Sequence, residues 1–271
     1  MEHEEESMNI RPTDNAFARI DAVSAEMRGK IIDYLDVVAG HPEMKRVRTA
    51  ASAIFAPSEG ERLLDAGCGA GEVARELGAQ VGSAGAVFAI DRSQQAVAVA
   101  QARHDGGPVT YQSGDVTALD FPDGHFDGVR CERVVQHLAD PDAAIAELAR
   151  VTRPGGRVCV IDTDWSSSVG DGFDHLDEVV GSFFPGHSAG RCVRSRMVRS
   201  GLRETSVLPV TLRFLSPADA GVVAPIFNRV LMREYLSEEL FDRFCSSVDR
   251  SADRGDFLYA FTMWISLGRV A

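Results

Sequence analysis

Residues 61–71 of this chain read ERLLDAGCGAG, and they decide the fold. A short apolar strand leads into Asp65, an acid placed directly before a turn. Three glycines then occupy alternate positions: Gly67, Gly69 and Gly71. Glycine removes side chains where a backbone must turn tightly and approach a ligand closely. The helix predicted to start near Glu72 would aim its free amide groups at that ligand.

Four segments downstream have the pattern that a nucleotide-binding α/β unit needs. The first is an apolar strand, residues 86–91 (AVFAID), which ends in Asp91, twenty residues after Gly71. A carboxylate at this place accepts hydrogen bonds from both ribose hydroxyls of a nucleotide. The others are a strand ending in Gly-Asp, a strand followed by VVQHL, and a turn feeding a fifth strand: residues 109–116, 126–138 and 153–161.

With these segments in register, residues 62–164 resemble the core of a class I S-adenosylmethionine-dependent methyltransferase. The resemblance is closest to the small-molecule group typified by ubiquinone and menaquinone methyltransferases. The matching residues are 65–71 (DAGCGAG), Asp91, Gly114 and Asp115, 136–138 (QHL) and 153–156 (RPGG). The resemblance implies an enzyme that binds S-adenosylmethionine and methylates a small molecule, such as a quinone or a natural product.

The resemblance also implies roles for individual residues around the cofactor. The loop from Gly67 to Gly71 would cradle the methionine part, and Asp65 would orient that loop. Asp91 would bind the ribose, and Asp115 would accept from the adenine amino group. The other implied cofactor residues are Cys68 and Gly69 in the loop, Arg92, Gly114 and Val116 around the adenine, and Cys131 and Glu132 beside the methionine end.

Two other functions remain open from the sequence. A nicotinamide oxidoreductase carries G-x-G-x-x-G, which requires a third glycine five positions after Gly67. That position is Glu72, and the third glycine is instead Gly71, so the spacing disfavours this class. The other alternative is a protein of the methyltransferase fold that binds the cofactor without transferring a methyl group.

Acceptor binding and catalysis leave a weaker pattern. A nucleophilic acceptor can need a general base, and His137 is the candidate because it follows the fourth strand. Its structural alternative is a histidine that packs at a helix start and bonds to backbone. Trp165, after the fifth strand, is either a stacking surface for an aromatic substrate or a core residue. Arg196 either holds an anionic substrate or belongs to a solvated basic face.

The alternation of strands and helices predicts an α/β fold. The expected strands are 61–65, 86–91, 109–113, 126–131 and 157–162, and the expected helices are 72–80, 93–104 and 141–152. Strands separated by helices pair in parallel through right-handed crossovers. With further strands at 207–214 and in 257–267, we expect a doubly wound, seven-stranded, mostly parallel sheet. The resemblance implies that the last strand lies antiparallel between the fifth and the sixth.

The segments outside this core are expected to add helices. Residues 1–56 are predicted to form a helical lid. Residues 57–271 are predicted to form the methyltransferase domain, with a helical insertion at about 165–205. In the resembling families, N-terminal helices fold over the cofactor, so Phe17 and Tyr34 are candidates to cover the ligand. For either residue alone, simple packing on the core is the alternative.

Composition limits the expected partners. A formal net charge of −12 disfavours nucleic-acid binding, which needs a basic surface. No apolar run approaches the roughly 18 residues of a membrane span, and the acidic N-terminus lacks the apolar core of a signal peptide, so a cytoplasmic location is expected. Five cysteines without a C-x-x-C pair and seven histidines without ligand spacing predict reduced thiols and no metal site. A homodimer is left open.

Overall fold

The computed structural model describes residues 25–184 and 188–271, and the candidate Phe17 lies outside them. Within this part, seven strands form one sheet in the order β3-β2-β1-β4-β5-β7-β6. The strands are β1 (Arg62–Ala66), β2 (Ala86–Asp91), β3 (Val109–Ser113), β4 (Phe126–Glu132), β5 (Thr152–Asp171), β6 (Arg203–Phe214) and β7 (Leu258–Arg269).

The helices of the described residues follow the chain around this sheet. The α-helices are α1 (Ala25–Gly40), α2 (Pro42–Phe55), α3 (Glu72–Val81), α4 (Gln94–Ala102), α5 (Pro141–Val151), α6 (Leu176–Phe183), α7 (Ala189–Arg199), α8 (Pro217–Val223), α9 (Arg229–Tyr235) and α10 (Glu238–Arg254). Two short 3-10 helices are η2 (Val135–His137) and η3 (Pro225–Phe227).

The strand pairing confirms the predicted sheet. β1 pairs in parallel with β2 on one side and with β4 on the other, and β3 and β5 extend the parallel part. β7 pairs antiparallel with both β5 and β6. The sheet is therefore doubly wound and mostly parallel, with its last strand inserted antiparallel between the fifth and the sixth.

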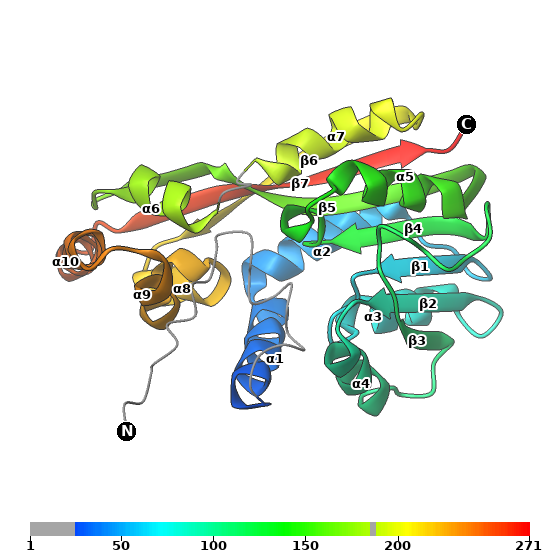
Figure 1. Cartoon of the computed structure of the whole chain (residues 1–271), viewed down its shortest axis with the longest axis horizontal. Helices are drawn as coiled ribbons and strands as arrows, with labels where there is room; N and C mark the ends of the chain where they lie inside the picture. Colours follow the sequence, from blue (N-terminus) through cyan, green and yellow to red (C-terminus); the bar gives the residue numbers. More distant parts are fainter. Residues whose placement is uncertain (1–24, 185–187) are drawn as a thin grey trace, which may run out of the picture.

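Helices cover both faces of the sheet (Figure 1). α2, α3 and α4 pack on one face, in a core that includes Leu63 of β1. α5 and α7 pack on the other face, where Ile145 and Met197 share a core with Leu64. Leu63 and Leu64 are neighbours that point to opposite faces, because successive side chains of a strand alternate. A parallel strand covered on both faces is therefore apolar at consecutive positions.

Local capping signals set the starts of two helices on these faces. The side chain of Asp140 accepts from the amide of Ala143 at 2.9 Å, and Pro141 occupies the first position of α5. In α2, Nδ1 of His41 accepts from the amide of Glu43 at 3.2 Å. In both caps the acceptor side chain and the amide donor lie within three residues of each other in the sequence. Both helix starts can therefore be predicted from the local sequence.

β5 is longer than the sequence predicts. The sequence favours a strand that ends at residues 162–165 and a helical insertion after it, but β5 continues to Asp171. Beyond a bulge, this extension pairs with β7, with Val169 opposite Ala260. Its serines and glycine fit a strand poorly by intrinsic propensity, so the partner strand specifies it. The division into a lid of residues 1–56 and a domain of residues 57–271 stays a prediction.

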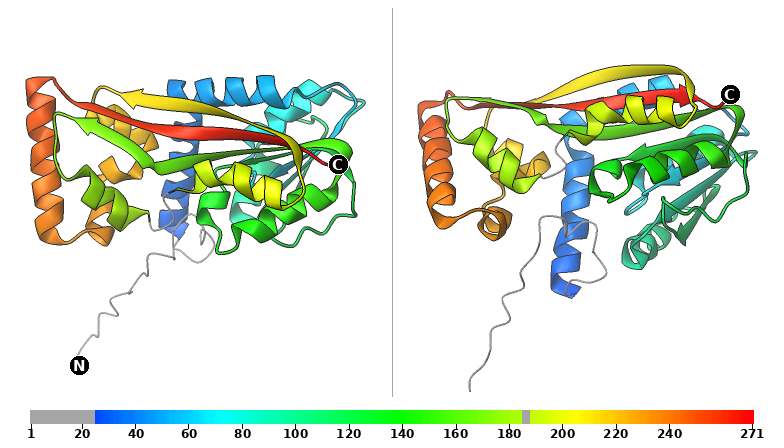
Figure 2. Two further views of the ribbon diagram at one scale, coloured as in Figure 1. Left: turned by 90° about the horizontal axis from the view of Figure 1, so that it is seen from above. Right: turned by 45° about the horizontal axis from the view of Figure 1, so that its top comes forward.

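The extended ends of β5, β7 and β6 carry a helical cap, which we define as α6, α8, α9 and α10 (Figure 2). Four phenylalanine rings pack against one another there, with ring centroids 5.1–5.8 Å apart: Phe173, Phe227, Phe244 and Phe257. Most of the cap comes from residues 217–254, outside the predicted insertion. α7, which lies inside that insertion, packs with α5 on the other half of the molecule.

Candidate functional site

The glycine loop, residues 67–71, crosses from β1 to α3 in a backbone conformation that favours glycine. Gly67, Gly69 and Gly71 have φ angles of 83°, 51° and 86°. The amides of Gly67 and Cys68 both donate to the carbonyl of Ile90, each at 2.8 Å. The loop is therefore fixed against the end of β2.

The three glycines face different surroundings. A Cβ on Gly67 would lie 2.1 Å from Cγ2 of Val134, and one on Gly71 would lie 2.9 Å from the ring of Tyr111. At Gly69 the nearest atom to such a Cβ is Cδ1 of Leu35 in α1, at 3.9 Å. Gly67 and Gly71 are therefore required by the packing of the protein itself, whereas a Cβ on Gly69 would make only an ordinary contact with Leu35 among the described residues.

The carboxylate of Asp91 ties this loop to the following helix. Its Oδ2 accepts from the amide of Gly69 at 2.9 Å, and its Oδ1 accepts from the amide of Ser93 at 2.9 Å. Ser93 in turn caps α4, because its hydroxyl accepts from the amide of Ala96 at 3.1 Å. Asp91 thus holds the glycine loop in place, a role that its position in the sequence does not reveal.

Asp65, at the end of β1, is buried immediately before the loop. Its Oδ2 has no hydrogen-bond partner within the described part of the chain. Burial raises the pKa of Asp65 to about 7, although the charge of Arg130 acts in the opposite direction. Buried polar atoms normally have partners. This oxygen is therefore a candidate to accept a hydrogen bond from a bound ligand.

A buried ion-pair network lies beside Asp65. Arg130 of β4 is opposite Asp65 in the strand register and has 0% of its surface exposed. Its Nη2 donates to Glu132 at 2.7 Å, and Nε of Arg48, from α2, donates to the other oxygen at 2.9 Å. Burial alone would raise the pKa of Glu132, but the two guanidinium groups outweigh it and lower the pKa to about 2. Glu132 therefore stays ionised and joins α2 to the sheet.

The sequence analysis did not predict a role for Arg48 or Arg130. A signal existed for Arg130, which is a charged residue inside the apolar strand FDGVRCE. No comparable signal marks Arg48, because its partner is brought to α2 only by the folding of β4.

The residues expected around an adenine meet at the carboxyl ends of β2 and β3. Gly114 follows β3, and its amide donates to the carbonyl of Asp91 at 3.0 Å. Asp115 is exposed, and its Oδ1 accepts from the amide and hydroxyl of Thr117 at 2.8 and 2.7 Å. These hydrogen bonds and the nearby charge of Arg92 lower the pKa of Asp115. Asp115 is therefore ionised near neutral pH.

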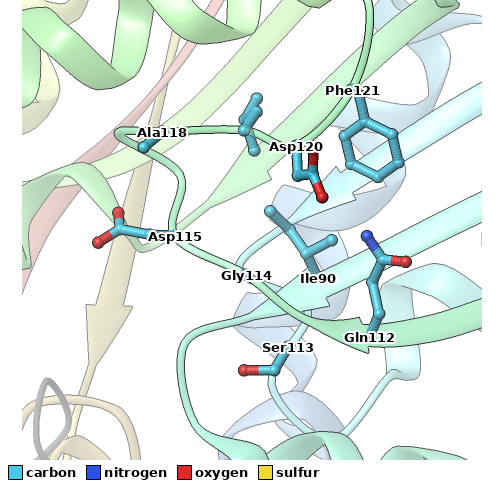
Figure 3. Close-up of a pocket in the computed structure, with 9 residues that line it drawn as sticks. Ile90, Gln112, Ser113, Gly114, Asp115, Ala118, Asp120 and Phe121 are labelled. Atoms are coloured by element: carbon cyan, nitrogen blue, oxygen red, sulfur yellow. The ribbon is translucent and has the colours of Figure 1, made fainter.

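A cavity of about 230 Å³ opens at this edge. It is lined by Ile90, Gln112, Ser113, Gly114, Asp115, Ala118, Leu119, Asp120 and Phe121. Figure 3 shows Gln112, Asp120 and Phe121 gathered around Ile90, whereas the carboxylate of Asp115 points away from them. The cavity contains no residue of the glycine loop, and its volume is below the roughly 300–1,000 Å³ of usual ligand pockets. It does not by itself define the site.

η2 brings a polar network to the carboxyl end of β4 and the middle of β5. The amide of Gln136 donates to Oδ2 of Asp162 at 3.0 Å, and its side-chain oxygen accepts from Nε1 of Trp165 at 2.9 Å. Trp165 is buried, and its ring stacks on Phe184 with centroids 4.1 Å apart. The candidate Trp165 is thus part of a packed aromatic wall at this edge.

His137, the candidate base, ends η2. Burial and the nearby charge of Arg133 lower the pKa of His137 to about 4. The imidazole is therefore neutral near pH 7, the form that can accept a proton. Burial also raises the pKa of neighbouring Asp162 to about 7. Two groups of perturbed pKa at one strand edge are typical of functional sites and also occur in structural networks.

Tyr34 and Arg196 are placed in different halves of the molecule. The hydroxyl of Tyr34 donates to the carbonyl of Val223 at 3.2 Å and joins α1 to α8 of the helical cap. Nη1 of Arg196 donates to Asp142 of α5 at 2.6 Å, and Arg199 pairs with the same acid. The structure does not bring Arg196 to the other candidate residues.

The two cysteines predicted near the cofactor are buried. Cys131 has no exposed surface, and Cys68 is nearly covered. Burial raises the pKa of both thiols. Each is therefore protonated near neutral pH and is not a nucleophile there.

Across residues 25–184 and 188–271, no group of three or more His, Cys, Asp or Glu could hold a metal ion. None of the helices in the described part of the chain combines the length and apolar character of a membrane span.

The part of the chain that carries the glycine loop is similar to known proteins. Residues 64–160 match the family model described as "Methyltransferase domain". The chain is 33% identical over 193 residues to an uncharacterized 37.1 kDa protein in transposon Tn4556 of Streptomyces fradiae, covering 68% of this chain and 55% of that protein. It is 37% identical over 111 residues to 2-phytyl-1,4-naphtoquinone methyltransferase of Synechococcus elongatus, covering 40% of this chain and 48% of that enzyme. The chain thus spans about half the length of these relatives.

The fold is also found in solved structures. The YcgJ protein from Bacillus subtilis has a TM-score of 0.57 at 22% identity, over 82% of this chain and 98% of that chain. At this identity the likeness is one of fold.

Proposed function

We propose that this chain, a member of the class I S-adenosylmethionine-dependent methyltransferases, transfers the methyl group of that cofactor to a small molecule. The observation that carries the proposal is the glycine loop, in which Gly69 is not closely packed by the described residues and its amide is held by Asp91. The loop follows β1, which lies between β2 and β4. From β1 the chain continues to β2 and β3 on one side, and it then returns to β4 on the other side of β1. Open α/β sheets bind ligands at the place where the strand order reverses in this way.

The residues present fit the proposed cofactor. Oδ2 of Asp65 is a buried acceptor without a partner in the described chain, and the methionine part of the cofactor carries an ammonium donor. The positive charge of the cofactor would favour the ionised form of Asp65. Gly69 leaves space where any larger residue would project toward the ligand. When bound, the cofactor supplies an electrophilic methyl group on a sulfonium.

The other cofactor contacts follow from the strand edges. We assign Asp91 to the ribose hydroxyls and Asp115 to the adenine amino group, with the amide of Val116 and the side chain of Arg92 beside the ring. Asp91 and Gly114 are linked backbone to backbone at 3.0 Å, so the ends of β2 and β3 form one continuous edge. This continuity supports binding of the ribose and the adenine by neighbouring strands.

The chain's own part in the reaction is to align the acceptor and exclude water. α1 lies across the glycine loop, with Leu35 nearest to Gly69, and Tyr34 connects α1 to the cap. We assign His137 the role of proton acceptor, because its imidazole is neutral and lies at the acceptor side of η2.

The proposed acceptor is a quinone-like compound or a natural product. The Synechococcus relative is named a naphthoquinone methyltransferase. Phe184, which is half-buried and stacks on the buried Trp165, supplies an aromatic ring in the same part of the molecule. We further propose a cytoplasmic location and no nucleic-acid partner, which the net charge of −12 supports. A homodimer is also proposed, and light scattering of the purified chain would test it.

A radiolabel experiment tests the transfer itself. The chain is incubated with methyl-tritiated S-adenosylmethionine and a panel that includes a naphthoquinol, a phenol and an aliphatic amine. We expect label in one extracted organic product, with S-adenosylhomocysteine formed in equal amount. Cofactor binding without label transfer to the panel or to a total metabolite extract would instead support the alternative of a binding protein that does not transfer methyl groups.

A further inference from the structure

Arg133 follows β4 directly and has an unusual backbone. Its φ angle is 57°, in the left-handed region. Its amide donates to the carbonyl of Ile161 at 2.8 Å, so this conformation is fixed by β5. Glycine or asparagine adopts it at lower cost, and other residues held there cluster at functional sites. An arginine at this position indicates that the side chain itself is needed.

The guanidinium group of Arg133 faces three elements. It donates a hydrogen bond to the hydroxyl of Tyr34 in α1. Its charge acts on His137 in η2 and on Asp162 in β5. These elements meet beside the carboxyl end of β4 and the middle of β5, where we place the acceptor.

Asp162, on which the charge of Arg133 acts, forms no ion pair with this guanidinium. Its two oxygens accept from the amides of Gln136 and Thr163, at 3.0 and 2.8 Å. In the described part of the chain, Arg133 forms no ion pair with a carboxylate, whereas its neighbour Arg130 is paired with Glu132. A half-buried cation in this position can bind an anion from outside the described chain.

Arg133 is also close to the glycine loop. Its chain neighbour Val134 contacts Gly67, and Leu35, the neighbour of Tyr34, is the residue nearest to Gly69. The hydrogen bond to Tyr34, whose hydroxyl also donates to the carbonyl of Val223 in α8, directs the guanidinium toward α1 and the helical cap. We therefore place it on the acceptor side of the site.

We propose that Arg133 binds an anionic oxygen of the methyl acceptor, and that the acceptor is an aromatic acid: a phenol, an enol or a carboxylic acid in its ionised form. This inference rests on the proposed function. The half-buried ring of Phe184, which stacks on the buried ring of Trp165, would contact the aromatic part, and Gln136 joins Trp165 to η2. Where the ionised oxygen is the nucleophile, the O–CH3 bond forms as the S–CH3 bond breaks. The sulfonium and the oxyanion then become two neutral products, and no proton moves in that step.

Two probes of equal shape and different charge test this proposal. Calorimetry measures the binding of 1-naphthoate and 1-naphthamide to the chain saturated with S-adenosylhomocysteine. We expect the wild type to prefer naphthoate by roughly tenfold or more, the range of a charge-assisted hydrogen bond. Arg133→Gly removes the guanidinium and suits the left-handed backbone, so it should melt no lower than the wild type. It should keep its S-adenosylhomocysteine affinity and lose the preference for naphthoate.

Matched variants separate the explanations. Arg133→Lys should retain part of the preference, and Arg250→Met, which removes an exposed arginine of α10, should retain all of it. An equal affinity for both probes, or binding of neither, in wild type that binds S-adenosylhomocysteine would overturn this inference and leave the proposed function standing. A loss of S-adenosylhomocysteine affinity in Arg133→Gly as large as the loss for naphthoate would place Arg133 at the cofactor's carboxylate and also overturn it. No binding of S-adenosylhomocysteine by the wild type would overturn both proposals.

Discussion

At the residue scale, the two acids beside the glycine loop have different roles. Asp91 accepts from two backbone amides, so it is a structural tie as well as a proposed ribose ligand. Asp65 has an oxygen without a partner among the described residues and a pKa of about 7. Asp65 is therefore expected to respond to pH and to ligand charge.

Replacing Asp91 with alanine should weaken S-adenosylmethionine binding by about 2–4 kcal/mol, because two charge-assisted hydrogen bonds to the ribose are lost. Affinity should fall on the order of 30- to 1000-fold. The free energy of unfolding should also fall, by about 1–2 kcal/mol, since the amides of Gly69 and Ser93 lose their acceptor. Calorimetry and thermal melting measure the two effects.

Ser93→Ala is the matched control for Asp91→Ala. It removes the hydroxyl that caps α4, which should cost about 1 kcal/mol of stability. Cofactor affinity should stay unchanged. If Asp91→Ala resembles this control, with lower stability and intact affinity, Asp91 is only a structural residue.

Asp65 should make both stability and cofactor affinity depend on pH. Its folded pKa of about 7 is above the unfolded value of 3.8, so the folded state binds the proton more tightly. The resulting stabilisation is fully present below pH 3.8 and is lost as pH rises through about 7. The cationic cofactor favours the ionised form, so its affinity should rise between about pH 6 and pH 8. Asp65→Asn should flatten both profiles, and unchanged profiles in this variant would contradict the assignment.

At the element scale, the Arg48–Glu132–Arg130 network joins α2 to the centre of the sheet. The guanidinium groups of Arg48 in α2 and of Arg130 in β4 donate to the two oxygens of one buried carboxylate, that of Glu132. Breaking a buried ion pair by removing one partner is costly, because the remaining charge stays buried.

Glu132→Gln should therefore lower the free energy of unfolding by about 3–5 kcal/mol. The folded pKa of about 2 is below the ordinary value of 4.5. The stabilisation is therefore present above pH 4.5 and is lost as pH falls toward 2. Asp249→Asn, which breaks the exposed pair with Arg229, is the control and should cost less than about 1 kcal/mol. Denaturant titrations that give the two variants equal stability would refute a structural role for Glu132.

The sequence predicts those elements whose determinants are local. The starts of α5 and α2 follow from capping residues within one helical turn, and the buried strands follow from apolar runs such as Val158 to Ile161. The extension of β5 could not be predicted, because Val169 is held by Ala260 of a strand far along the chain. Asp65, Asp91 and Glu132 were predictable as residues at strand ends, because strand ends follow from local patterns. Their hydrogen-bond partners and protonation states were not, because these depend on residues far away in the sequence.

At the scale of the whole molecule, the sheet has two halves with different tasks. The parallel half carries the glycine loop, and the long β5–β7–β6 half carries the helical cap (Figure 1). α1 lies between them and contacts α2 and α8. The fold class and strand order were predictable from strand–helix alternation and the resemblance. The cap was not, because helices 217–254 carry no motif that relates them to the site.

The cap is expected to respond to ligands at α6. This helix is followed by Phe184, which stacks on Trp165 at the acceptor edge. Hydrogen exchange in Leu176–Phe183 should slow when both S-adenosylhomocysteine and an acceptor are bound, while exchange in α5 stays constant. Equal exchange of α6 in the free and bound states would identify it as a rigid structural helix.

The central claim is that the glycine loop binds S-adenosylmethionine, and one calorimetric comparison tests it most directly. Wild type and Gly69→Val are each titrated with S-adenosylmethionine and with NAD. We expect wild type to bind one S-adenosylmethionine per chain and no NAD. The valine variant, which stays folded by circular dichroism, should lose this binding because its branched side chain projects into the space bordered by Gly69 at a φ of 51°. Equal S-adenosylmethionine affinity in both proteins, or NAD binding in place of S-adenosylmethionine, would contradict the account.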